Sequence, residues 1–186
     1  MSLYTLALFL HVSGDVGIFI GLGVQLLSLA ALRRARSTEQ VRIVAALITL
    51  SDPIAVISAL LTVTAGLYMA LTIWGLQHGW IAVSLTSIVV FLPPVIRIVI
   101  EPRMRAIVTM AKEMPDGPLP AALQVRIHDP VLGTALQTMA AIVFGIVFLM
   151  TIKPSLVGSI AAMIVALILG LASGLPLWLT ARTNRI

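Results

Sequence analysis

Five long apolar segments restrict the fold of this chain more than any other feature. A helix that crosses the hydrocarbon core of a bilayer needs about 20 apolar residues, each rising about 1.5 Å. The segments that meet this requirement are 3–32, 53–75, 80–100, 130–152 and 154–180. Their length and continuity indicate helices, because membrane-spanning β-strands alternate polar and apolar residues. The sequence therefore predicts an all-α membrane protein, a single bundle of five transmembrane helices over residues 1–186.

The composition agrees with this fold class. Hydrophobic residues make up 60% of the chain and charged residues 10%, whereas a soluble domain carries about 25% charged residues. The chain has no cysteine. Disulfides, iron–sulfur clusters and thiolate metal sites are therefore excluded.

The basic residues predict the orientation of the bundle. Cytoplasmic loops of membrane proteins are enriched in Lys and Arg. Eleven of the 12 basic residues fall on one predicted side, and Lys153 falls on the other. We therefore expect an outer N-terminus and a cytoplasmic C-terminus, in the inner (plasma) membrane of a bacterium. The net charge of +5 then predicts membrane lipids as partners and no nucleic acid. The eleven residues are Arg33, Arg34, Arg36, Arg42, Arg97, Arg103, Arg105, Lys112, Arg126, Arg182 and Arg185.

Two further helical segments are expected on the cytoplasmic side, at 38–51 and 103–114. The first is predicted to be a separate short helix, because Asp52-Pro53 is typical of a helix start in which Asp caps free amides and Pro occupies the first turn. Asp129-Pro130 predicts a second start of this kind. The segment 114–120 (MPDGPLP) is a turn-rich loop and the expected site of proteolytic nicking.

Small residues predict where helices approach closely. Gly14, Gly17 and Gly21 share one stripe of the first span, and Gly170 and Gly174 repeat the four-residue spacing in the last. Such spacing is typical of packing faces in membranes. The sequence leaves open whether they pack within one chain, in a homo-oligomer or against a larger membrane complex.

His11 and Asp15 are the polar residues least expected inside a span. Four residues apart, they share one helical face, at depths of roughly 12 and 18 Å from Leu3. A charge so deep costs about 3 kcal/mol unless it is paired or faces a cavity. Three interpretations stay open: an interhelical hydrogen bond, a metal or heme ligand at His11 oriented by Asp15, and a proton or substrate pathway.

Other residues are candidate partners of a cofactor at His11. Met69 and Met163 are predicted at the same depth. A His/Met pair ligates heme, and Met also suits copper(I), although methionine is commonly a packing residue. His78, in the loop WGLQHGW, is either an interfacial loop residue or a second group reaching a porphyrin or metal.

Several enzyme classes lack their motifs here. The sequence contains no Walker-type loop, no H-E-x-x-H, no Cys-x-x-Cys and no nucleophile elbow. A hydrolase or a metal enzyme with several ligands is therefore disfavoured, and whether the chain is an enzyme stays open.

The start LALFLHVSGDVGIFIGLG resembles the first helix of a bacterial membrane group that includes the copper-resistance protein D domain and the HemJ-type protoporphyrinogen oxidases. The stretches TAGLYMALTIWGLQHGW and VIEPRMRAI are similar to a small integral membrane family of unknown function in the same neighbourhood. The resemblance covers about the first 110 residues.

The resemblance to the HemJ-type enzymes implies a b-type heme near His11. Those enzymes also use a lysine in a later helix, and none of the predicted spans here contains one. The resemblance to the copper-resistance group implies copper handling. The leading hypothesis is a heme-binding or electron-carrying membrane subunit that uses His11. The alternatives are a permease for copper or another small solute, and a structural subunit of a larger membrane complex.

Overall fold

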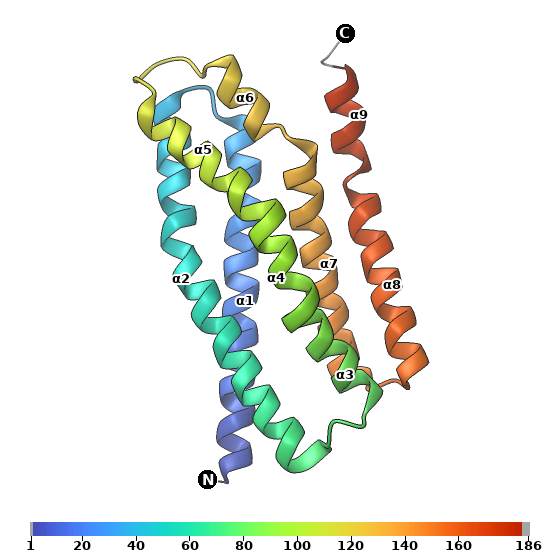
Figure 1. The fold of residues 1–186 in the computed structure, drawn as a ribbon. Helices are drawn as coiled ribbons and strands as arrows, with labels where there is room; N and C mark the ends of the chain where they lie inside the picture. Colours follow the sequence, from blue (N-terminus) through green and yellow to red (C-terminus); the bar gives the residue numbers. More distant parts are fainter. Residues whose placement is uncertain (1, 184–186) are drawn as a thin grey trace.

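The computed structural model describes residues 2–183 of the chain, and the side chains of residues 2–179 (Figure 1). The predicted tail cation Arg185 and the side chain of Arg182 lie outside these residues. In chain order the elements are α1 (Leu3–Arg34), α2 (Thr38–Met69), η1 (Ala70–Trp74), α3 (Gly79–Thr86), η2 (Ser87–Phe91), α4 (Leu92–Pro94), η3 (Val95–Ile100), α5 (Glu101–Glu113), α6 (Ala121–Ile127), α7 (Pro130–Ile152), α8 (Leu156–Ser173) and α9 (Leu175–Thr183).

These elements join into five helical stretches that are long and apolar enough to cross a membrane, counted over the described residues. The fold is therefore all-α, with five long apolar helices. The stretches are Leu3–Arg34, Thr38–Trp74, Gly79–Glu113, Ala121–Ile152 and Leu156–Leu179.

The second stretch corrects one sequence expectation. Instead of a separate helix over 38–51 followed by a new start at Pro53, α2 runs without interruption from Thr38, with Pro53 inside it. Ser37 is its N-cap and accepts a hydrogen bond from the amide of Gln40, whereas Asp52 caps nothing. A proline removes one backbone hydrogen bond, but neighbouring helices and local adjustment make this tolerable in an apolar bundle.

The helices pair closely through small residues. α1 lies along α2, and α7 along α8 (Figure 1). A Cβ at Gly21 would lie 2.9 Å from the Cβ of Ala55, and one at Gly170 would lie 2.6 Å from the Cα of Thr138. Gly14 and Gly17 face α2 in the same way. These glycines therefore pack against neighbouring helices of the same chain.

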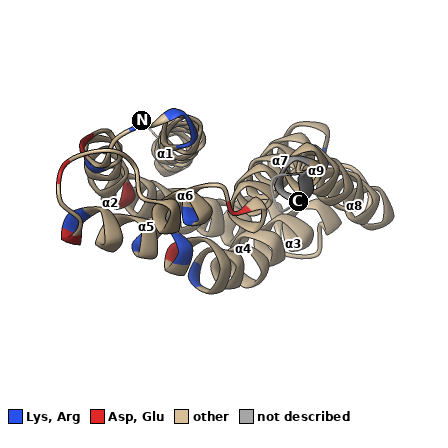
Figure 2. Cartoon of the chain, turned by 90° about the horizontal axis from the view of Figure 1, so that it is seen from above, with Lys and Arg blue, Asp and Glu red and all other residues tan. Residues whose placement is uncertain are grey.

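The arginine-rich end of the bundle carries Arg33, Arg36, Arg42, Arg103 and Arg126. Figure 2 looks down on this end and shows charged residues gathered over α1, α2, α5 and α6. We call the opposite end, which carries Trp74, Trp80 and Lys153, the tryptophan end.

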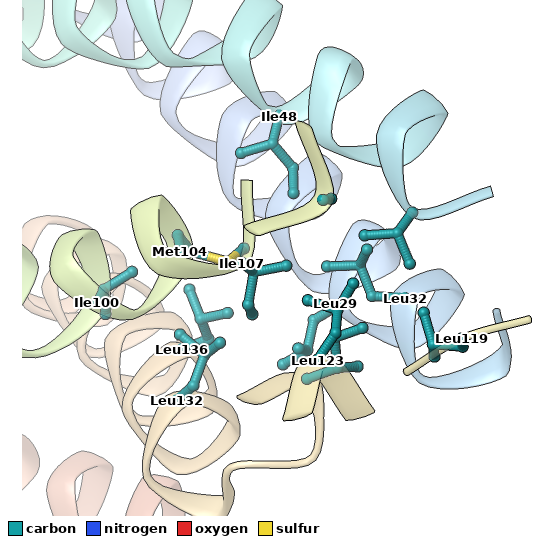
Figure 3. Close-up of a cluster of buried hydrophobic side chains, with 13 residues drawn as sticks. Leu29, Leu32, Ile48, Ile100, Met104, Ile107, Leu119, Leu123, Leu132 and Leu136 are labelled. Carbon is teal, nitrogen blue, oxygen red and sulfur yellow. The ribbon is translucent and has the colours of Figure 1, made fainter. Parts of the chain in front are cut away.

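The main hydrophobic core lies at the arginine-rich end. There α5 and α6 close over the last turns of α1 and the first turns of α2 and α7 (Figure 3). This end is therefore a packed cap. Its buried members are Leu29, Leu32, Val41, Ile48, Ile100, Met104, Ile107, Ala111, Leu119, Leu123, Ile127, Leu132 and Leu136.

The loop 114–120 is fastened to this cap. Arg42 donates hydrogen bonds to the carbonyls of Ala111 at 2.9 Å and Met114 at 3.1 Å, and pairs with Asp116. The backbone amide of Leu119 also donates to the carbonyl of Arg36 at 3.1 Å. The loop is therefore held by hydrogen bonds along its length.

Candidate functional site

A cavity lies at the tryptophan end, between the α1–α2 pair on one side and α3 and α7 on the other. Its volume is about 320 Å³, near the lower limit for pockets that bind small molecules. Most of its wall is apolar. The polar and charged side chains that line it are Tyr4, His11, Asp15, Thr62, Trp74, Trp80, Ser84, Thr151 and Lys153.

His11 is oriented by the backbone of α2. Its Nδ1 lies 2.7 Å from the carbonyl oxygen of Thr62. A carbonyl only accepts, so Nδ1 carries the proton that is donated. In the neutral ring this leaves the lone pair of Nε2 free, which is the arrangement found in metal-ligating histidines. His11 is 8% exposed, so packing restricts the orientation of its ring.

A missing side chain makes room for this ring. A Cβ at Gly66 would lie 2.8 Å from Cε1 of His11 and 2.9 Å from Nδ1. The imidazole therefore lies directly on the backbone of α2. Thr62, one turn before Gly66, also donates from Oγ1 to the carbonyl of His11 at 3.4 Å, so the two helices contact each other reciprocally at this level.

Asp15 faces the free nitrogen of His11. Its Oδ2 lies 3.8 Å from Nε2, one turn further along α1. The side chain of Asp15 is 28% exposed, and it borders the cavity. The pair is therefore accessible to a molecule in the cavity.

The mouth of the cavity carries a cation held by aromatic rings. The Nζ of Lys153 lies 4.0 Å from the ring centroid of Trp74 and 5.7 Å from that of Trp80. The two indole rings meet edge to face at 5.7 Å. Lys153 is the C-cap of α7 and lies in the left-handed region, with φ of 52°. The cavity thus has a positive rim and a carboxyl group inside.

The structure brings together only some of the residues singled out in the sequence. His11, Asp15 and Met69 line the cavity. His78 lies beside the mouth, with its ring 6.3 Å from that of Trp74 and its Nδ1 3.3 Å from the carbonyl of Gly75. Met163 lies in the α7–α8 contact, against Gly145, and does not border the cavity.

Met69 does not lie opposite His11 across the cavity, as a pair of ligands on the two faces of one cofactor would. It lies on α2, three residues beyond Gly66, the position on which the His11 ring rests. The two side chains therefore belong to the same wall of the cavity. Moreover, no group of three or more His, Asp or Glu side chains suited to a metal occurs among the described residues.

Sequence reasoning missed several lining residues. Ser84 and Met150 come from α3 and α7, and no pattern in the sequence indicates that they face His11. Lys153 did carry a signal, because it was the one basic residue on its predicted side.

The chain was compared with protein-family models, with curated proteins and with solved structures. None of these comparisons found a match.

Proposed function

We propose that the chain is a multi-pass membrane protein of the bacterial inner membrane, with its arginine-rich end in the cytoplasm and its tryptophan end outside. The five apolar helical stretches and the segregation of basic residues support this orientation. Tryptophans at the opposite end suit the second interface.

Single cysteines test the orientation, because the natural chain has none. Gln77→Cys in the loop at the tryptophan end should react with a membrane-impermeant maleimide in intact cells. Lys112→Cys at the other end should react only after the cells are permeabilised. The opposite pattern would reverse the topology, and equal labelling of both before permeabilisation would exclude a membrane barrier between them.

We further propose that the cavity is a binding site for a small, mainly apolar ligand, with His11 as the residue that contacts it and Asp15 as a carboxyl group beside the contacting nitrogen. The observation that carries this proposal is the imidazole of His11 in the cavity wall, whose Nδ1 donates to the carbonyl of Thr62 and whose Nε2 is left free beside the carboxyl group of Asp15. A buried imidazole with a fixed tautomer is suited to ligation or proton exchange.

A b-type heme is the first ligand to test, and the resemblance of the first helix to heme-binding membrane proteins supports it. His11 would hold the heme iron through its free nitrogen, and Lys153 would pair with an acidic substituent of the porphyrin. A His/Met-ligated heme does not fit, because Met69 lies on the same wall as His11. A bound heme would supply one-electron redox chemistry, and the chain would then serve as an electron-carrying subunit.

Absorption spectroscopy tests this ligand directly. Protein purified from heme-sufficient cells should show a Soret band that His11→Ala removes and that His78→Ala and His128→Ala retain. A wild-type protein without a Soret band would exclude heme. A band that survives His11→Ala would exclude His11 as the ligand.

A permease for copper or another small solute is the second candidate. Its support is the shared wall of His11 and Met69, whose side chains are ligand types that copper(I) accepts. Purified protein should then bind copper(I), with weaker binding in both Met69→Leu and His11→Ala and unchanged binding in Met163→Leu. Equal binding by all variants would place the metal elsewhere.

A further inference from the structure

A second cavity, of about 270 Å³, lies at the arginine-rich end between the last turns of α1 and the first turns of α7. From it we infer a second binding site: a slot for one anionic phospholipid, with the phosphate against Arg33 and Arg34 and an acyl chain along Leu26 and Leu29. This inference rests on the membrane placement proposed above and is independent of any ligand at His11.

The guanidinium of Arg33 is only partly provided with hydrogen-bond partners. Its Nε is buried and has no hydrogen-bond partner. Its Nη2 reaches only a backbone carbonyl, that of Asp129, at 3.5 Å. The carboxylate of Asp129 is already paired with Nε of Arg103 at 3.0 Å. Among the described side chains, Arg33 therefore has no ion pair of its own.

An unpaired buried donor is unfavourable, and more so when it is charged. A phosphate group would relieve this cost, because its oxygens accept hydrogen bonds from the planar guanidinium in a bidentate arrangement.

The backbone of α7 makes room for this guanidinium. A Cβ at Gly133 would lie 2.6 Å from Nη2 of Arg33, so the side chain lies across α7 at a position where any larger residue would displace it. One turn further along α7, Gln137 also lines the slot. Its Oε1 accepts a hydrogen bond from Ser173 at 3.2 Å, which leaves the amide N–H groups as donors for an anion.

The rest of the slot favours a lipid over free phosphate. Its remaining lining, Leu26, Leu29 and Ala30, is apolar and extends along α1 away from the arginines. Leu26 precedes Arg33 by seven residues, about 10 Å along a helix. A headgroup at the guanidinium would therefore have an apolar track beneath it for the first part of an acyl chain.

Lipid binding to the detergent-purified full chain tests the site. Native mass spectrometry should detect one dioleoyl phosphatidylglycerol bound at low lipid concentration, and the same lipid should raise the unfolding temperature. Phosphatidylcholine should do neither, and inorganic phosphate at matched concentration should leave the unfolding temperature unchanged.

Variants separate the slot from general surface charge. Arg33→Gln should weaken phosphatidylglycerol binding by about tenfold or more, because charged hydrogen bonds are lost. Arg126→Gln is the matched control, since Arg126 is an exposed arginine at the same end, and it should bind as the wild type does. If Arg33→Gln does not fold, Arg34→Gln and Gln137→Leu provide the comparison, because both leave the contact between Arg33 and Asp129 intact.

Three results would overturn the inference. Equal binding of phosphatidylcholine would show a slot that does not select charge. An effect of inorganic phosphate equal to that of the lipid would show a free-anion site. Equal loss in Arg126→Gln and the slot variants would show attraction to the whole basic surface. None of these results bears on the Soret band or the cysteine-labelling pattern, so the proposals fail separately.

Discussion

The imidazole of His11 rests on the backbone of Gly66, one helix away, at a distance that excludes a side chain. A Cβ at Gly66 would come within 2.8 Å of Cε1, and the neighbouring Nδ1 of the ring donates to the carbonyl of Thr62 at 2.7 Å. The position of the His11 imidazole thus depends on Gly66, a residue that has no side chain.

Gly66→Ala should therefore displace the imidazole and break its hydrogen bond to Thr62. The expected loss of stability is about 1–3 kcal/mol, as for overpacking in a core, together with loss of any ligand signal at His11. Thermal unfolding in detergent and the absorption spectrum measure the two effects.

Gly23→Ala is the matched control, because no heavy atom lies within 4 Å of a Cβ built there. It should be neutral or stabilising by up to about 1 kcal/mol, since alanine is the better helix former. If both alanine variants behave alike, the close packing of His11 on α2 is contradicted.

The carboxyl group of Asp129 has two separable roles. Its Oδ1 caps α7 by accepting from the amide of Val131 at 2.9 Å, while its Oδ2 pairs with Arg103 at 3.0 Å. Asp129→Asn keeps a capping oxygen and loses the charge, whereas Asp129→Ala loses both. We expect Asp129→Ala to be less stable than Asp129→Asn by about 1 kcal/mol, the usual value of an N-cap. Denaturant unfolding of the two variants measures this difference, and equal stabilities would show that the cap contributes nothing.

Arg42 should control access of proteases to the loop 114–120. Arg42→Ala removes three hydrogen bonds to Ala111, Met114 and Asp116, so local opening should cost less and cleavage after Glu113 should be faster. Limited proteolysis in detergent, followed by mass spectrometry, gives the rate. Arg36→Ala is the control, because Arg36 accepts the hydrogen bond from Leu119 through its backbone carbonyl, which alanine also has. This variant should be cleaved at the wild-type rate. Unchanged cleavage of Arg42→Ala would show that the backbone contacts alone hold the loop.

The core of the cap should be sensitive to side-chain truncation. Ile107 is 1% exposed and Ile98, on the same helical stretch, is 70% exposed. Ile107→Ala leaves a cavity and should cost about 2–5 kcal/mol, whereas Ile98→Ala should change stability by no more than about 0.5 kcal/mol. Unfolding in detergent measures both, and similar losses would contradict the position of the core.

The helical architecture was predictable because it depends on segment length and hydrophobicity, which the sequence displays directly. The start of α2 shows the limit of predicting helix boundaries from local sequence. Asp52-Pro53 has the local pattern of a helix start, yet the helix continues through it. Packing of α2 against α1 favours a continuous helix, and the local sequence pattern does not show this packing.

The candidate site was predictable only along α1. The spacing of His11 and Asp15 places them on one face whatever the partner, and the structure has them 3.8 Å apart. Depth counting found Met69 and Met163 at one level but could not tell which way each faces, so it did not separate a cavity residue from a packing residue. The carbonyl of Thr62, which orients His11, belongs to the backbone and leaves no mark in the sequence.

Packing is distributed unevenly along the bundle, since the cap at the arginine-rich end holds most of the buried apolar side chains and the cavity separates the helices at the other. The α1–α2 pair is thereby packed into the cap at one extremity and borders the cavity at the other. Hinge-like motion about the cap would widen or narrow the aperture beside Lys153 without unfolding any helix. A molecule larger than the cavity could then enter if the α1–α2 and α7–α8 pairs moved apart at the tryptophan end.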